Sequence, residues 1–580
     1  MPDIRPSDSL IVVGARLNSS RLPRKHLLEL AGVPLIVRVF ERLAAIGVPA
    51  VLATTADDFN QELVRLGHDS GIPVVAYDGD IDNVVGRVDA VVREYQPERV
   101  VYVCGDCPLV SQDYIGMALQ ALRDNPDWEQ VLPAPGRSGE TVIHEGILCL
   151  SRAGWDELVA LSQSRLEQEH VGLALTKGAP LKRGSVREDD DFYGPRFRLS
   201  VDTAADWRFM DHLYSKWYAS HEGPVSLKWV VKQVRTTDVG QINKHVMQKS
   251  GYRSYGAAVF VTEASPTKGI GQLVRSVRLA ERVCELAGLG VTLLILGEPA
   301  PLECLRTVNH EWIGSEDDLL ARLTVVSLPS LIVIDLFPER LEHPAHLYDV
   351  IVRLVENDKR VVGLDRLWIW HRALSLVVVP CLVYRGVEAP NIAYGPGYAL
   401  APAWLPAGKC LMNEGVVLTV MTGGSDAIGY GEVLPELLDQ ILPKPVKVKW
   451  LLGPYAKFPN MPSDRRLEWE VLRAQADIAS VAMTSTVVLS VYGNTVLELL
   501  ANGIPVAVLP APGLMDEQEW FSICQHDGLL CVNATEKELA PLRDLLLSKS
   551  GRQRLQNRNN EFGAAGGLQR AAECVLATLD

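Results

Sequence analysis

The stretch LIVVGARLNSSRLPRKHLL at residues 10–28 joins an apolar run to a basic loop. The run Leu10–Val13 predicts a short buried strand. The loop after it contains no acidic residue and four basic ones, Arg16, Arg21, Arg24 and Lys25. Its small residues at 18–20 let backbone amides approach an oxyanion, while Arg21 and Lys25 supply charged donors. The loop therefore suits a di- or triphosphate; the alternative is a solvated basic loop.

Outward from this stretch, short apolar runs alternate with helical periodicity. Strands are predicted at Ala50–Ala53, Val74–Ala76 and Val100–Val103, and helices at Pro34–Ala45, Phe59–Ser70 and Val84–Tyr95. This alternation predicts a doubly wound, Rossmann-like α/β domain with a mostly parallel sheet covered on both faces. Ligands bind beyond the carboxyl ends of such strands, so the loops after Val13 and Val103 are the expected site.

Two aspartates follow predicted strands. Asp106 stands in VCGDCPLV, and Asp202 stands in RLSVDTAADW. Two carboxylates at strand ends commonly hold one Mg²⁺, which takes oxygen ligands and keeps waters beside substrate phosphates. The alternative is helix capping, for which Asp202 has a suitable position. Asp106 lies inside a Cys104–Cys107 CxxC, but a second CxxC or a zinc-spaced Cys/His pair is missing, so the aspartate is favoured over the thiols.

The chain of 580 residues is too long for a single hydrophobic core. The polar stretch Lys244–Gly256 marks the main boundary, and a second series of alternating strands and helices follows it. The Ala- and Pro-rich run Leu400–Lys409 divides that series into two lobes. We therefore predict a doubly wound α/β domain at 1–246 and two Rossmann-like lobes at 257–405 and 406–580.

Composition narrows the classes of function. The formal net charge of -14 argues against nucleic-acid or membrane-surface binding, which needs clustered positive charge. The longest apolar runs are about ten residues, short of the roughly 20 that span a bilayer. Ten cysteines without regular spacing suit reduced thiols, and the N-terminal residues lack the features of a signal peptide. A cytoplasmic protein without nucleic-acid or membrane partners is expected.

Five segments of the first domain carry a family resemblance. In order, they are GARLNSSRLPRKHLLELAGVPLI, DGDIDNVVGRVDAVV, GDCPLV, EQEHV and SVDTAADW. Together they resemble the spore-coat polysaccharide type of cytidylyltransferase, relatives of the acylneuraminate cytidylyltransferases. The resemblance implies CTP and Mg²⁺ binding and transfer of CMP to a sugar or sugar acid. The family usually has Gly where this chain has Asn18 and Arg24.

The resemblance also implies roles for individual residues. Arg21, Lys25 and Asp106 would be catalytic, and Asp106 and Asp202 would hold the metal. Arg16 and Ser19 would face the triphosphate beside them, and Asn83 and Arg87 would lie near the nucleoside. Glu169 and His170 are candidates for contact with the acceptor sugar; the alternative is a surface helix face.

Three glycine-bearing turns punctuate the second half of the chain. They are KGIGQLVRS at 268–276, TGGSD at 422–426 and YGNTVLELLANGIP at 492–505. Each places glycine before a predicted helix, where N-terminal amides can bind phosphate. The alternative for any one of them is a tight turn without a ligand.

With AYGPGYAL at 393–400 and the patch 516–518, these turns resemble the UDP-sugar hydrolase of the pseudaminic acid pathway and its spore-coat relatives, which have a two-lobed GT-B-like fold. The resemblance assigns nucleotide-sugar binding to Gly424, Ser425, Gly493, Thr495 and Glu498. The family's catalytic histidine is replaced by Gln272, and Phe337 stands where a DxY pattern would place tyrosine. A neutral amide cannot accept a proton near pH 7, so hydrolysis is doubtful.

The leading hypothesis is a Mg²⁺-dependent cytidylyltransferase that couples CTP to a nonulosonic or related sugar acid, with a nucleotide-sugar-binding second half. The alternatives are a non-catalytic nucleotide-sugar-binding or assembly protein, and a glycosyltransferase or altered hydrolase acting through the second half. The resemblance is also compatible with a homodimer. For its interface the candidate residues are Trp207, Trp217 and Trp229, with burial in the core as the alternative.

Overall fold

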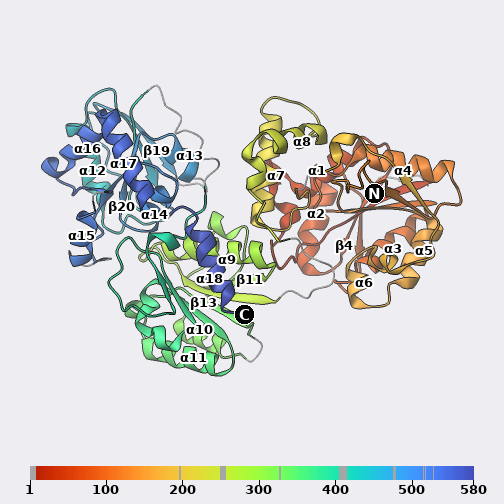
Figure 1. The fold of residues 1–580 in the computed structure, drawn as a ribbon, viewed down its shortest axis with the longest axis horizontal. Helices are drawn as coiled ribbons and strands as arrows, with labels where there is room; N and C mark the ends of the chain where they lie inside the picture. Colours follow the sequence, from red (N-terminus) through yellow and green to blue (C-terminus); the bar gives the residue numbers. More distant parts are fainter. Residues whose placement is uncertain are drawn as a thin grey trace. The chain divides into compact units, whose positions relative to one another are not determined.

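The computed structural model describes residues 8–194, 197–247, 256–325, 328–403, 415–473, 478–513, 515, 517–526 and 528–579. The chain divides into two compact units, one ending at residue 254 and the other beginning at 255. Figure 1 colours the first unit from red to yellow and the second from green to blue.

The first unit contains a seven-stranded sheet. Its spatial order is β5 (Val74–Tyr77), β4 (Ala50–Thr55), β1 (Ser9–Gly14), β6 (Arg99–Cys104), β8 (Ile147–Ser151), β7 (Gln130–Pro133) and β9 (Arg183–Val186). The four strands from β5 to β6 run parallel. The predicted strands at 10–13, 50–53, 74–76 and 100–103 are all present, each longer by one or two residues.

One strand reverses the direction of the sheet. β8 pairs antiparallel with both β6 and β7, with Val103 opposite Ile147. The residues that precede β8 therefore lie at the edge where the residues after β6 lie. The amide of Cys104 accordingly donates to the carbonyl of Gly146 at 2.8 Å.

Helices cover both faces of this sheet, as the burial of consecutive residues along β1 requires. Ile11 and Val13 pack with residues of α1, α4, α7 and α8, whereas Leu10 and Val12 pack with α3 and α5. The helices are α1 (Leu35–Ala44), α2 (Gln61–Asp69), α3 (Val84–Tyr95), α4 (Gln112–Asp124), α5 (Arg152–Leu161), α6 (Arg165–Glu169), α7 (Ala204–Tyr218) and α8 (Leu227–Thr236). α2 starts two residues after the predicted position because residues 58–60 form a 3₁₀ turn capped by Asp57.

The second unit contains two parallel sheets. The first has the order β12 (Asn309–Ile313), β11 (Gly290–Leu296), β10 (Ala257–Glu263), β13 (Leu331–Ile334), β14 (Arg360–Leu364), β15 (Leu376–Val379) and β16 (Ile392–Tyr394). The second has the order β19 (Glu468–Arg473), β18 (Lys447–Leu452), β17 (Val417–Met421), β20 (Val487–Val491), β21 (Val506–Leu509) and β22 (Leu530–Cys531).

The helices of the second unit pack around these two sheets (Figure 1). They are α9 (Gly271–Ala287), α10 (Glu316–Leu323), α11 (Pro344–Glu356), α12 (Tyr430–Ile441), α13 (Ile478–Met483), α14 (Asn494–Ala501), α15 (Glu517–Cys524), α16 (Glu536–Leu547), α17 (Lys549–Glu561) and α18 (Gly567–Ala577). α18 follows the second sheet in sequence but packs on α9, where Leu568 and Val575 join the core of the first sheet. The predicted fold class, a doubly wound domain followed by a two-lobed α/β unit, is confirmed.

Within the described ranges, the helices are too short or too polar to cross a membrane. Much of the run 400–409 that was predicted to divide the lobes lies outside the described residues, as does Asp516.

Candidate functional site

The basic loop after β1 folds back on itself. The amide of Leu17 donates to Asn60 Oδ1 at 2.7 Å, and the amide of Arg24 donates to the Leu17 carbonyl at 2.9 Å. Ser19 Oγ accepts from the amide of Leu22 at 3.3 Å, and both leucines are buried. Arg24 has a left-handed backbone, with φ of 53°, and starts the 3₁₀ turn that turns Lys25 inward. The loop is a folded element that carries Lys25 into the unit.

Asp106 reaches the same place from β6. Gly105 directly after β6 donates its amide to the carbonyl of Gly14 at 2.9 Å. A Cβ on Gly105 would lie 2.8 Å from that carbonyl oxygen, so only glycine allows the two loops to approach this closely. The carbonyl of Asp106 accepts from the amide of Val201 at 2.8 Å, which brings the segment containing Asp202 alongside.

Four of the predicted residues converge at this edge of the sheet. Lys25 Nζ lies 2.5 Å from Asp106 Oδ2 and 3.0 Å from Asp202 Oδ1. Arg21 Nη2 lies 2.8 Å from Asp202 Oδ1. The side chains of Arg21 and Lys25 are each 10% exposed, and those of the two aspartates about 20%. The cluster of Arg21, Lys25, Asp106 and Asp202 is referred to below as the aspartate site.

Asp202 does not cap the following helix. Thr203 is the N-cap of α7, and its hydroxyl accepts from the amide of Asp206 while the Asp206 carboxylate accepts from the amide of Thr203. Both Asp202 oxygens instead face cations, because Arg198 Nη2 lies 2.9 Å from Oδ2. The carboxylate of Asp202 is thus not used for helix capping and belongs to the aspartate site.

Charge pairing dominates the electrostatics of this site. Burial alone would raise the pKa of Asp202, but the charges of Lys25, Arg21 and Arg198 outweigh it and lower that pKa. Burial alone would lower the pKa of Lys25, but Asp106 and Asp202 raise it above its usual range. Both groups are therefore charged at neutral pH. Next to them, burial and the charge of Lys25 lower the pKa of His26 to about 3, so its imidazole is neutral.

The donor set limits how the site can hold a metal. Within the described part of the chain, no group of three or more His, Cys, Asp or Glu side chains is placed to hold an ion. Asp106 and Asp202 present two carboxylates toward one point, which Lys25 Nζ contacts. This set fits Mg²⁺, which is commonly held by one or two carboxylates while substrate phosphates and water complete its shell.

Arg16 and Arg87 lie beside the aspartate site and brace a loop. Arg16 Nη1 donates to the Ile81 carbonyl at 3.0 Å and to Asp82 Oδ1 at 2.5 Å. Arg87 is 1% exposed and donates to the carbonyls of Ala15 and Ile81 at 3.2 and 2.8 Å. Arg87 therefore fixes the backbone between the two loops. Arg87 contributes shape to this place, and its Nη1 and Nη2 groups are occupied by these two carbonyls.

The remaining predicted residues of this unit, Asn83, Glu169 and His170, lie in different surroundings. Asn83 caps α3, with its side chain accepting from the amide of Gly86 at 2.8 Å. Glu169 Oε1 lies 3.7 Å from Arg16 Nη2, which places the end of α6 near the basic loop. His170 follows α6 and donates its amide to the Leu166 carbonyl at 3.1 Å.

The structure adds residues that were not predicted. Arg198 pairs with Asp202 and with Asp206, and Asn243 Nδ2 donates to Asp206 Oδ1 at 3.0 Å. Glu145 Oε2 accepts from the Ser200 hydroxyl at 2.8 Å. Arg198 stands in the same motif as Asp202, four residues earlier, so its signal was present in the sequence. The sequence contained no such signal for Glu145, because the position of Glu145 depends on the reversal of β8.

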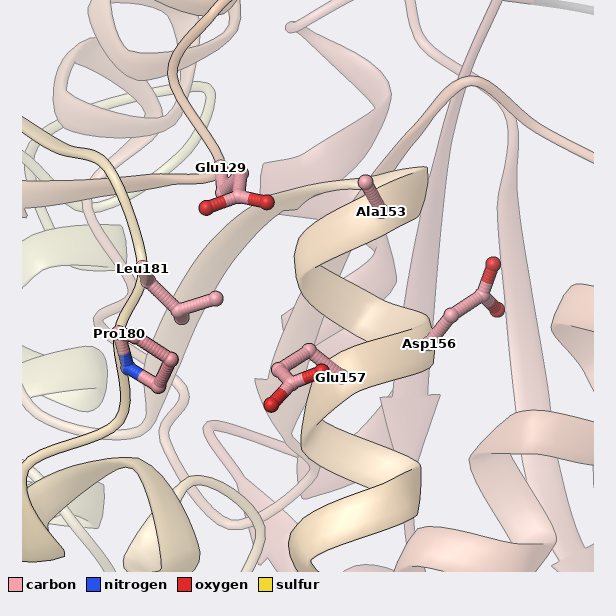
Figure 2. A pocket seen from close by; sticks show the side chains of 6 residues that line it. All are labelled: Glu129, Ala153, Asp156, Glu157, Pro180 and Leu181. Atoms are coloured by element: carbon pink, nitrogen blue, oxygen red, sulfur yellow. The ribbon is translucent and has the colours of Figure 1, made fainter.

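A cavity of about 520 Å³ lies elsewhere in the first unit. Its lining residues are Glu129, Ala153, Asp156, Glu157, Pro180 and Leu181, and Figure 2 shows carboxylates on both sides of it. Its lining includes three acidic residues and no basic one, which disfavours a phosphate ligand.

Two of the three tryptophans considered for an interface pack together. The rings of Trp217 and Trp229 meet edge to face at 5.3 Å, and Trp217 is 9% exposed. Trp207 Nε1 donates to the Glu29 carbonyl at 2.9 Å. Trp217 thus belongs to the core of the unit, and a homodimer stays a prediction.

In the second unit the three glycine turns meet. Asn494 Nδ2, at the start of α14, donates to the carbonyl of Gly271 at 2.9 Å. A Cβ on Gly424 would lie 3.4 Å from the amide nitrogen of Ile270, and one on Gly269 would lie 3.8 Å from Ser425 Oγ. Gly424 and Ser425 therefore lie in a turn near the start of α9, and Gly493 and Thr495 lie at the start of α14 near the same place.

Glu498 is already paired in this unit. Its carboxylate forms a two-pronged ion pair with Arg278 of α9, in which Nη2 lies 2.9 Å from Oε2. The side chain of Glu498 is 4% exposed. For Glu498 to contact a nucleotide as predicted, Arg278 would have to share the Glu498 carboxylate or release it.

Gln272 and Asp335 have structural partners. Gln272 Nε2 donates to the Asp335 carbonyl at 3.2 Å, and Arg340 Nη1 donates to Gln272 Oε1 at 3.4 Å. The Asp335 carboxylate is fully buried against Arg275, which also pairs with Asp365 at 2.7 Å. Phe337 lies under Arg340, with the guanidinium carbon 4.5 Å from the ring centroid.

Comparison with known proteins addresses the first unit most directly. Residues 10–166 match the family described as Cytidylyltransferase. A 3-deoxy-manno-octulosonate cytidylyltransferase of Bartonella bacilliformis is 33% identical over 20% of this chain and 48% of its own length. The chain thus spans about half the length of that relative. These matches agree with the resemblance predicted for the first unit.

Two further proteins extend the comparison. The spore coat polysaccharide biosynthesis protein SpsF of Bacillus subtilis is 28% identical over 36% of this chain and 88% of its own length. The solved structure of MurG from Acinetobacter baumannii covers 55% of this chain and 99% of its own, with 13% identity and a TM-score of 0.41.

Proposed function

We propose that the first unit is a Mg²⁺-dependent cytidylyltransferase that joins CMP from CTP to a sugar acid and releases pyrophosphate. One observation carries this proposal: Asp106 and Asp202 converge at the carboxyl edge of the sheet beside Arg21 and Lys25. The match of residues 10–166 to the Cytidylyltransferase family supports the choice of nucleotide.

The acceptor is proposed from the names of the relatives. The Bartonella relative is named for 3-deoxy-manno-octulosonate, an acidic sugar. The B. subtilis relative is named for polysaccharide biosynthesis. A nonulosonic (sialic-acid-like) or related sugar acid, used for glycan biosynthesis, is the acceptor class that we propose for this chain.

In the proposed reaction, the acceptor hydroxyl oxygen attacks the α-phosphorus of CTP in line with the leaving group. A new P–O bond forms, the bond from the α-phosphorus to the bridging oxygen breaks, and pyrophosphate leaves with the electron pair while the hydroxyl proton passes to water. Asp106 and Asp202 would hold Mg²⁺, which supplies charge neutralisation at the phosphates when bound. Arg21 and Lys25 would stabilise the charge on pyrophosphate, and Arg198 would orient the Asp202 carboxylate.

For the second unit we propose nucleotide-sugar binding. The specific support is the meeting of the three glycine turns, which brings the starts of α9 and α14 together. Such helix ends offer amide donors to a diphosphate. Hydrolysis through residue 272 is disfavoured, because a Gln amide cannot take a proton from water near neutral pH. Transfer of a sugar by this unit is the second candidate.

The central experiment measures pyrophosphate release by the full chain with CTP, MgCl₂ and a panel of sugar acids. We expect release only when an acidic sugar is present, and with CTP in preference to the other three nucleoside triphosphates. Failure to release pyrophosphate with any sugar acid would favour the alternative, a binding or assembly protein. The Asp106→Asn variant, assayed in parallel, separates enzymatic release from contamination.

A second assay addresses the other unit in the full-length Asp106→Asn chain, in which we expect the activity of the first unit to be strongly reduced. Binding of UDP-sugars is measured by calorimetry, and release of UDP is measured with and without a sugar acceptor. Binding without release supports the binding role. Release that needs an acceptor identifies a glycosyltransferase, and release without an acceptor identifies hydrolysis through a different base.

A further inference from the structure

Lys25 occupies the point on which the two carboxylates of the aspartate site converge. Its ammonium contacts one oxygen of Asp106 at 2.5 Å and one of Asp202 at 3.0 Å. Arg21 and Arg198 pair with Asp202, whereas Lys25 pairs with both aspartates. The side chain is only 10% exposed, so the contact is held within the folded loop.

This contact conflicts with a metal ion bound to the same two oxygens. Mg²⁺ binds carboxylate oxygens at about 2.0–2.1 Å, so an ion between Asp106 and Asp202 would take the position of the ammonium. Two cations sharing these oxygens would also repel each other strongly at such short range, and more so in a largely buried site. Metal entry therefore requires Lys25 to leave.

Lys25 is able to leave, because its ammonium is a point charge on a flexible four-carbon stem. A triphosphate bound by the loop would offer it new anionic oxygens close by. We propose that the ammonium of Lys25 excludes divalent metal from the aspartate site until a bound nucleoside triphosphate draws the ammonium away. This inference rests on the proposed function, and it adds an order of events: metal binding at Asp106 and Asp202 depends on the nucleotide.

The test measures Mn²⁺ binding to the nucleotide-free full chain by electron paramagnetic resonance, without any turnover. The Lys25→Met variant removes the ammonium and keeps the length of the side chain. We expect it to bind one Mn²⁺ at least about tenfold more tightly than the wild type. The Arg24→Met variant is the matched control, since Arg24 is the neighbouring residue, is exposed and pairs with Glu62. It should bind Mn²⁺ as the wild type does.

Further variants locate the gained site. Adding Asp106→Asn to Lys25→Met should abolish the gain, and Lys25→Arg, which keeps a cation, should bind Mn²⁺ weakly. Equal, weak binding by Lys25→Met and the wild type would overturn the proposal. A second test does not depend on how the Lys25 variants fold. Tight stoichiometric Mn²⁺ binding by the wild type without nucleotide, lost in Asp106→Asn, would also overturn the proposal.

The outcome is separable from that of the proposed function. If pyrophosphate release is observed but Lys25→Met gains no affinity for Mn²⁺, the proposed cytidylyltransferase activity is supported and the proposed role of Lys25 in excluding metal is wrong. If Lys25→Met gains a metal site but no sugar acid supports pyrophosphate release, the role of Lys25 in excluding metal is supported and the proposed substrate is wrong.

Discussion

Arg198 donates from Nη2 to Asp202 Oδ2 at 2.9 Å, and its Nε lies 3.1 Å from Asp206 Oδ1. Asp206 is itself fixed by the cap of α7 and by Asn243. The buried network of Arg198, Asp206 and Asn243 therefore fixes the orientation of the Asp202 carboxylate. Groups of this kind orient a metal ligand without touching the substrate.

Arg198 is expected to act as a positioning residue. Arg198→Gln should lower kcat by about 10- to 100-fold and raise the Mg²⁺ concentration needed for half-maximal rate. Arg198→Lys should recover part of both losses. Steady-state kinetics over a range of Mg²⁺ concentrations measures them. Arg187→Gln, which removes an exposed arginine paired with Asp190, is the control. A loss of rate without any change in Mg²⁺ dependence would contradict a positioning role.

The two aspartates should be far more sensitive than the exposed part of the loop. Asp106→Asn and Asp202→Asn should each reduce kcat by about 10²- to 10³-fold, the usual cost of removing one preorganised electrostatic group. Arg24→Ala should stay close to wild type, because Arg24 is exposed and pairs with Glu62. Pyrophosphate release under saturating CTP checks all three. Comparable losses in the Arg24 and Asp106 variants would argue against the assigned site.

His26 should make the first unit sensitive to acid. Its pKa is lowered to about 3 by burial and by Lys25, against about 6.5 in an unfolded chain. Below pH 6.5 the unfolded state therefore binds a proton that the folded state does not. Stability supplied by this group is complete above pH 6.5 and is lost progressively as the pH falls toward 3.

The His26→Gln variant tests this expectation. Between pH 8 and pH 5 it should lose about 2 kcal/mol less stability than the wild type. Calorimetric unfolding at several pH values, compared with the exposed control His68→Gln, gives the difference. A stability difference between His26→Gln and wild type that does not change with pH would count against a neutral buried imidazole.

In the second unit, Arg278 and Glu498 should be strongly coupled. Arg278→Met alone leaves a carboxylate that is only 4% exposed without its partner, which typically costs about 3–5 kcal/mol. The double variant Arg278→Met, Glu498→Met should recover most of this loss, because no buried charge remains. Denaturant unfolding of the four species completes the cycle. The exposed pair Glu303–Arg306 is the control and should show little coupling. Additive effects at Arg278 and Glu498 would contradict the expectation.

Local patterns were sufficient for much of the fold. The apolar runs at Leu10–Val13 and Val100–Val103 are buried parallel strands, because a strand covered on both faces needs apolar side chains throughout. Basic residues after the first strand and an aspartate after the second then have to meet at one edge. For this reason Lys25 and Asp106 could be grouped from the sequence. The strand that was predicted before Asp202 is wrong, because residues 197–203 form no strand, and Asp202 reaches the site through the hydrogen bond from the Val201 amide to the Asp106 carbonyl.

Other features depend on contacts that no local pattern reveals. Arg87 has the residue type of a ligand-binding group, but it is buried and holds two carbonyls. Asn83 is occupied as a helix cap. The return of α18 to the first sheet of its unit follows from Leu568 and Val575 filling that core, and the sequence shows only an amphipathic helix. In each case, long-range packing decides which role a residue type takes.

The reversal of β8 has a consequence for how the edge of the sheet beside the aspartate site can change in sequence. A parallel sheet offers only the segments that leave its strands for building a pocket, but a reversed strand adds a segment that enters the sheet. Glu145 reaches Ser200 by this route. Insertions or deletions between β7 and β8 can therefore remodel the segment beside Asp106 and Asp202 while the register of β1, β4 and β6 stays unchanged. Under the proposed function, a change of acceptor would then leave the two aspartates in place.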